Sequence, residues 1–126
     1  MTFRVRHIEF FRIDMQTRFP FRYGIASMTD LPHLVVRIDA ETDGRPCQGV
    51  AADGLAPKWF TKHPETTYEQ DDLPAMLRSI RHAADRAVET GPRASLFDWW
   101  WETYQAQRVW GIQHGIASLL SGFGCS

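Results

Sequence analysis

The stretch LVVRIDAETDGRPCQGVAADG, from Leu34 to Gly54, decides the fold of this chain. Apolar residues recur at every second position from Leu34 to Ala40, which is the period of a half-buried strand. Thr42-Asp43-Gly44 predicts a tight turn, because glycine adopts a positive φ without steric cost and aspartate favours turns. The segment from Cys47 to Ala51 predicts a second strand. The block is therefore expected to form a β-hairpin.

The residues before the hairpin predict a third, irregular strand. Within Phe3–Met15 the apolar positions change parity after His7 and change back at Phe11, as they do around a β-bulge. The segment RFPFRYG (Arg18–Gly24) contains a proline and a glycine, which interrupt pairing and favour a loop. We expect a three-stranded antiparallel meander with one face covered by helices.

An irregular loop and a helix are expected after the hairpin. The segment 53–64 contains two prolines and has no sustained period. Thr66-Thr67-Tyr68-Glu69 fits a capping box, and Pro74, tolerated only in a first turn, places the helix start near Asp71 or Asp72. Gly91-Pro92 ends this helix. Its predicted apolar stripe comprises Leu73, Met76, Leu77, Ile80, Ala84, Ala87 and Val88.

The next helix, SLFDWWWETYQAQRVW (95–110), can be capped by Ser95 with Asp98. Its three consecutive tryptophans cover an arc of about 200°. The helix is therefore either buried on two sides or carries an exposed apolar patch. We expect Phe97, Trp100 and Tyr104 to contact the sheet or the first helix. Trp101 and Trp110 are expected to face another surface.

Composition predicts one domain with a packed core: 126 residues, 44% of them hydrophobic. The net charge of −1, from 14 basic and 15 acidic residues, gives no reason to expect nucleic acid or a membrane as partner. The alternating N-terminus does not fit a signal peptide. Cys47 and Cys125 lack metal-ligand spacing and favour reduced thiols in the cytoplasm. A disulfide between chains through Cys125 is the alternative.

In their order, these elements resemble the N-terminal capping domain of the enolase superfamily, of the mandelate racemase/muconate lactonizing type. The resemblance is carried by the strand Phe3–Met15, the RFPFRYG segment, the hairpin and the helix pair, and it extends to about Ser118. It implies an α+β fold, a three-stranded meander followed by a small helical bundle. It also implies that residues 1–115 form the cap and that residues 116–126 begin a barrel domain.

The resemblance implies a function that depends on that barrel. In the family, the cap closes the mouth of a modified (β/α)7β barrel, which supplies three acidic ligands for Mg²⁺ and the bases that abstract a proton next to a carboxylate. We therefore expect no cofactor in this chain and no catalysis by it alone. Its expected partners are the missing barrel domain or another copy of itself, with a small carboxylate substrate only when a barrel is present.

Two cap loops of the family correspond to Phe19–Asp30 and Asp53–Lys62. The residues that the resemblance places near a substrate are Phe21, Arg22, Tyr23, Met28, Asp53, Lys58, Trp59 and Phe60. Arg22 and Lys58 can hold a carboxylate, although Arg22 can equally be solvated. Trp59 and Phe60 either exclude water or anchor their loop to the core. Many relatives carry a glutamate after the glycine of the third strand, and here that acid is displaced to Asp53 or absent.

The sequence contains no catalytic or metal-binding motif. The acidic residues Asp71 and Asp72 are explained by helix capping. The five histidines are scattered without ligand or nucleophile-partner spacing, and neither cysteine has an adjacent base. A second hypothesis is an interaction module that self-associates through exposed aromatic residues. A small enzyme using His and Asp is disfavoured by their spacing.

Overall fold

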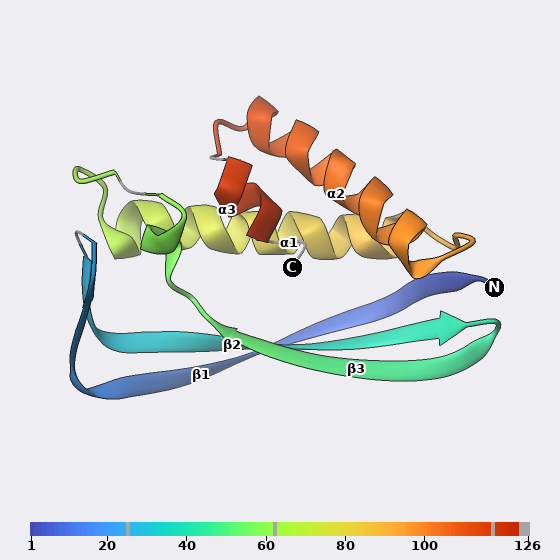
Figure 1. The fold of residues 1–126 in the computed structure, drawn as a ribbon, viewed down its shortest axis with the longest axis horizontal. Helices are drawn as coiled ribbons and strands as arrows, with labels where there is room; N and C mark the ends of the chain where they lie inside the picture. Colours follow the sequence, from blue (N-terminus) through green and yellow to red (C-terminus); the bar gives the residue numbers. More distant parts are fainter. Residues whose placement is uncertain (25, 62, 117, 124–126) are drawn as a thin grey trace.

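The computed structural model describes residues 1–24, 26–61, 63–116 and 118–123 and shows an antiparallel sheet with helices on one face (Figure 1). The strands pair in the order β1-β2-β3. The predicted α+β meander followed by helices is confirmed. The bounds of the elements are β1 Phe3–Tyr23, β2 Ala26–Thr42, β3 Arg45–Gly54, η1 Pro57–Trp59, η2 Tyr68–Asp72, α1 Leu73–Glu89, α2 Leu96–Gln113 and α3 Ser118–Phe123. Among the described residues, no helix combines the length and apolarity needed to cross a bilayer.

The β2–β3 hairpin forms as predicted. Its two central turn residues, Asp43 and Gly44, have φ angles of 52° and 74°, the left-handed pair that matches the twist of a hairpin. The side chains of Leu34, Val36 and Ile38 face the helices and line a groove with residues of α1 and α2. On the other face, a guanidinium nitrogen of Arg37 lies 2.6 Å from a carboxylate oxygen of Glu9 on β1.

Strand β1 contains the predicted bulge but not the predicted return of parity. The pairing with β2 shifts between Val5 and His7, as the first change of parity indicates. Pairing then continues without a shift from His7 to Gln16. Phe11, Ile13 and Met15 therefore lie on the face away from the helices, with 48%, 51% and 47% of their surface exposed.

The RFPFRYG segment is not a loop, in contrast to the prediction. Gln16 pairs with Asp30, and pairing resumes where Phe21 faces Met28, so that residues 17–20 lie opposite Thr29 alone. Pro20 falls in this bulge, where its missing N–H removes no ladder hydrogen bond. The first predicted cap loop is consequently the end of a two-stranded hairpin.

The helical turn before α1 is capped one residue later than predicted. The hydroxyl oxygen of Thr67 accepts a hydrogen bond from the amide of Gln70, and the Asp71 carboxylate accepts one from the amide of Thr67 at 2.9 Å. The hydroxyl of Thr66, expected in that role, donates to Asp72 at 2.8 Å. The helix α1 then begins near the predicted position.

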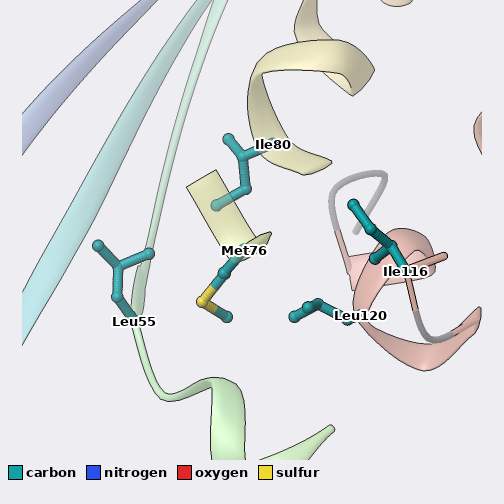
Figure 2. Packing of buried hydrophobic residues seen from close by; sticks show 5 residues of the cluster. All are labelled: Leu55, Met76, Ile80, Ile116 and Leu120. Atoms are coloured by element: carbon teal, nitrogen blue, oxygen red, sulfur yellow. The ribbon is translucent and has the colours of Figure 1, made fainter. Parts of the chain in front are cut away.

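The hydrophobic core joins the end of β3 to α1 and to the last helical segment (Figure 2). Burial of each such aliphatic side chain contributes about 1.5–3 kcal/mol. Leu77 and Val88, predicted in the apolar stripe of α1, are instead 40% and 38% exposed. The core residues are Leu55, Met76, Ile80, Ile116 and Leu120. Ile116 and Leu120 thus pack with Leu55 and with residues of α1, and the domain boundary after residue 115 stays a prediction.

The buried face of α2 differs from the predicted stripe. The serine cap is confirmed, because Ser95 Oγ accepts from the Asp98 amide at 3.0 Å. Phe97, however, is 64% exposed and does not meet the sheet. Trp110 stacks on His82 of α1 with ring centroids 4.3 Å apart, so it faces the first helix and not elsewhere. The buried residues of α2 are Thr103, Gln107 and Gly111.

Polar and small residues set this face, which explains why Phe97 lies outside it. Gln107 is fully buried between the two helices. Its Nε2 donates to the carbonyl of Ser79 at 2.8 Å, and its Oε1 accepts from Nδ1 of His82. Gly111 lets α3 approach, because a Cβ there would lie 2.8 Å from the Ser121 side chain. An apolar-periodicity argument does not register either contact.

We predict that Gln107→Leu lowers the free energy of unfolding by about 1–3 kcal/mol, because it leaves buried hydrogen-bonding groups of α1 without a partner. The measurement is urea unfolding followed by circular dichroism. The matched control is Gln113→Leu, the same change at an exposed position of the same helix, with an expected effect within about 0.5 kcal/mol. Equal effects of the two variants would contradict a stabilising role for the Gln107 hydrogen bonds to α1.

A second prediction concerns pH. Arg93 donates two hydrogen bonds of 2.6 Å to the Glu102 carboxylate, and this pairing holds the pKa of Glu102 below its ordinary value of 4.5. Because the folded-state pKa of Glu102 is depressed, the stabilisation is fully present above the ordinary value of 4.5. It is lost as the pH falls from there through the folded-state pKa. Glu102→Gln should lower the melting temperature at pH 7, and this difference should shrink as the pH falls below 4.5. A difference that stays constant with pH, or that equally accompanies Glu65→Gln, would contradict this assignment.

Candidate functional site

Two segments distant in sequence meet at one end of the molecule, where the β1–β2 hairpin lies beside the loop that follows β3 (Figure 1). Between them is a cleft of about 910 Å³. The hairpin supplies one wall, including Met28 and Asp30, and the loop and η2 supply the other, including Lys58 and Tyr68. The two segments predicted as cap loops therefore border one cavity.

The loop is fixed to the sheet by hydrogen bonds of its own. The Leu55 amide donates to the carbonyl of Pro32 at 2.8 Å. The hydroxyl of Tyr68, at the start of η2, donates to the Leu55 carbonyl at 3.0 Å. Because the Leu55 side chain is also part of the core, this wall of the cleft is rigidly placed.

Lys58 is held by the protein's own groups. Its ammonium donates to the carbonyl of His63 at 2.6 Å and to both the carbonyl and the hydroxyl of Thr66, at 3.2 and 2.7 Å. These three acceptors use the three N–H donors of an ammonium group. Asp72 Oδ2 lies 3.0 Å from the same nitrogen but off the direction of a hydrogen bond. The side chains of Lys58 and Asp72 are only 14% and 4% exposed.

The charges around the cleft do not favour an anionic ligand. Two cations, Arg12 and Lys58, and three acids, Asp14, Asp30 and Glu69, line it, so these residues sum to −1. The Arg12 Nε donates to Asp14 at 2.8 Å. Both cations on the described walls are thus already paired with acids. A carboxylate ligand in this cleft requires further positive charge from outside it.

Of the residues predicted near a substrate, Met28 and Lys58 line the cleft. Phe21 pairs with Met28 across the hairpin and is 50% exposed. Arg22 is exposed on the same hairpin, opposite Ser27. For Tyr23 the structure describes only the backbone.

The other residues predicted near a substrate lie in different surroundings. Trp59 is 53% exposed, whereas Phe60 packs against the core, so that Phe60 anchors the loop to the core. Asp53 accepts a hydrogen bond from the Gly54 amide at 2.7 Å. It lines a second groove of about 480 Å³ between the sheet and the helices. Lys62, at the end of the predicted loop, lies outside the described residues.

Sequence reasoning missed five residues that shape the cleft: Arg12, Asp14, Asp30, Tyr68 and Glu69. The signal that would have found the first three is strand register. Asp14 lies opposite Pro32, and Gln16 lies opposite Asp30. The prediction of a loop at RFPFRYG hid this pairing.

Within the described part of the chain, no group of three or more His, Cys, Asp or Glu side chains is arranged to hold a metal ion. These residues therefore do not fit the Mg²⁺ site of the family that the sequence resembles. No step of the function proposed below passes through a metal held by this chain.

No protein-family model and no curated protein matches the chain. A search of solved structures finds a crystal structure of an enolase from "alpha pretobacterium bal199" with bound Mg. The likeness has a TM-score of 0.55 at 18% sequence identity and covers 98% of this chain and 30% of the enolase chain. Nearly the whole chain thus shares the fold of less than a third of a magnesium-bound enolase. That fold is the α+β, N-terminal-domain-like arrangement that the sequence predicted.

We predict that Lys58→Met lowers the free energy of unfolding by about 3–5 kcal/mol, because it leaves the buried Asp72 carboxylate without its counter-ion. The double variant Lys58→Met/Asp72→Asn should be more stable than Lys58→Met alone, since it removes the uncompensated charge. Urea unfolding measures both. If the double variant is the less stable of the two, Asp72 does not depend on Lys58.

Proposed function

We propose that this chain is a substrate-capping domain of the mandelate racemase/muconate lactonizing type. It covers the mouth of a barrel supplied outside residues 1–126 and is itself catalytically inactive. The complete assembly acts on a small carboxylate by Mg²⁺-dependent abstraction of the proton next to the carboxyl group. The Mg²⁺ ligands and the base belong to the barrel, and the assembly works in the cytoplasm.

One observation carries this proposal. The two segments that border the cleft present large aromatic side chains to the outside: Phe19 and Phe21 are 79% and 50% exposed, and Trp59 is 53% exposed. Exposed aromatic side chains on segments that border one cleft favour a surface that covers them. Aromatic side chains at the mouth of a site exclude water when a lid closes over it.

The charges of the cleft also support a function divided between the cap and a barrel. Its two cations are held by acids of the chain, and its lining sums to −1. A carboxylate substrate is therefore bound by positive groups of the barrel, while the cap supplies apolar contact. Arg22, exposed at the hairpin end, is the cap residue able to add a bidentate contact to the carboxylate.

The first test has two parts. In D₂O with Mg²⁺ and a panel of sugar acids and other 2-hydroxy acids, the chain alone should exchange no α-proton, as read by NMR. Exchange by this chain that a single side-chain substitution abolishes would refute the inactive cap. The genome should encode a barrel downstream of codon 126, in the same or a shifted frame, or in a separate gene. Absence of any barrel with three spaced acidic residues would refute the proposed assembly.

A second test uses the chain together with that barrel. Trp59→Ala should lower kcat/KM by roughly one to two orders of magnitude, because loss of the lid contact admits water and loosens the substrate. The matched control is Trp101→Ala, a tryptophan of similar exposure on α2, which should leave kcat/KM unchanged. Equal losses in both variants would indicate a general effect on folding and contradict a lid role for Trp59.

A further inference from the structure

The outward face of α2 carries exposed apolar side chains from its first turn to its last. Its residues follow one another at steps of three or four along the helix, which places them on one side, and we call them the outer stripe: Phe97, Trp101, Tyr104, Arg108 and Ile112. Phe97, Trp101 and Ile112 are 64%, 46% and 75% exposed. A helix that is apolar on most of its circumference is normally covered on more than one side. The buried residues of α2, Thr103, Gln107 and Gly111, lie on another side of the helix. Of the outer stripe, Tyr104 is half-buried beside Gly122 of α3.

The outer stripe is a pre-arranged surface. The rings of Phe97 and Trp101 are stacked with centroids 6.2 Å apart and an angle of 8° between their planes. The ring of Tyr104 continues the stack, 6.0 Å from Trp101 at 26°. Side chains fixed by mutual stacking lose little conformational entropy when a partner covers them. Such aromatic residues are the usual anchors of protein interfaces.

We propose that the outer stripe binds the outer stripe of a second copy of this chain, with the two α2 helices antiparallel. The two-fold axis passes between positions 104 and 105. Phe97 then lies at the same height as Ile112 of the partner subunit, and Trp101 lies at the height of Arg108 of the partner subunit. An isologous contact of this kind uses one patch twice and closes after two copies.

Charge complementarity selects the second copy and its direction. The stripe has its acid, Asp98, beside its N-terminal end and its cation, Arg108, in its C-terminal half. In the antiparallel pair, each Arg108 guanidinium reaches an indole face of the partner and lies one helical turn from the partner's Asp98. A parallel pair would instead set Arg108 against Arg108. Arg108 has no hydrogen bond or ion pair with the rest of the described chain, whereas Arg86 and Arg93 are paired with Glu89 and Glu102.

The size of the stripe limits the affinity. A helix of 18 residues is about 27 Å long and about 10 Å wide, so that one helix face buries only a few hundred Å² per copy. Stable interfaces bury about 800 Å² per partner. The dimer is therefore weak, with a Kd of about 10–100 µM. This inference is independent of the capping function: a monomeric chain would leave that proposal unaffected.

Analytical ultracentrifugation between 5 and 500 µM tests the dimer. The weight-average mass should rise toward twice the monomer mass over this range. Arg108→Glu should raise the Kd at least tenfold, and Trp101→Gln should do the same by removing the facing indole. Arg78→Glu is the matched control, because Arg78 is also an exposed arginine but lies on α1, and it should leave the Kd unchanged. A monomer at every concentration, or equal effects of Arg108→Glu and Arg78→Glu, overturns the proposal.

Cysteine crosslinking tests the direction. In a variant with both native cysteines replaced by serine, Gln105→Cys lies next to the two-fold axis and should form a disulfide-linked dimer on mild oxidation. Gln113→Cys lies at the far end of α2, opposite the helix start of the partner, and should not crosslink. Circular dichroism confirms that each variant is folded. Crosslinking of both variants to the same extent, or of Gln113→Cys alone, overturns the antiparallel arrangement.

Discussion

The Lys58 ammonium is the contact on which the shape of the candidate site depends. It joins two carbonyl oxygens, a hydroxyl and the buried Asp72 carboxylate, and thereby ties the loop after β3 to the start of α1. The loop then holds Leu55 in the core, and the hydroxyl of Tyr68 donates to the Leu55 carbonyl. Without this charge, the loop would have to supply other donors for a carboxylate that is 4% exposed. One wall of the cleft thus depends on an ion pair that serves structure, not ligand binding.

The sheet shows how far sequence reasoning reaches. Alternation over Leu34–Ala40 and the Asp43-Gly44 turn are local signals, and the structure confirms them. The extension of β1 past Pro20 depends on its partner: pairing resumes at Phe21 only because Met28 of β2 is in register. The sequence of one strand alone does not distinguish a proline that interrupts pairing from a proline placed within a bulge. The cleft wall at Asp14 and Asp30 was therefore not predictable without the register.

The two helices show a different limit. Their existence and approximate ends follow from periodicity, Pro74 and Gly91, and the cap of α2 follows from Ser95. Their mutual rotation does not, because it is set by Gln107 and Gly111, a buried amide and a glycine that any apolar scale ranks as poor core residues. Because Gln107 satisfies groups on α1, it turns Thr103 inward and Phe97 outward. The tryptophan run predicted either burial on two sides or an exposed patch, and this rotation produces the patch.

The apolar surface of the chain lies at separate places, and this separation bears on how the domain is used. The hairpin end carries Phe19, the outer face of the sheet carries Ile13, and α2 carries Ile112, each at least half exposed. A domain of this size buries about two-thirds of its extended-chain surface, so that its own core does not need these residues. In the proposed capping function, the exposed aromatic residues on the segments that border the cleft form the lid. The stripe on α2 belongs to another element and suits a contact that persists whether the lid is open or closed.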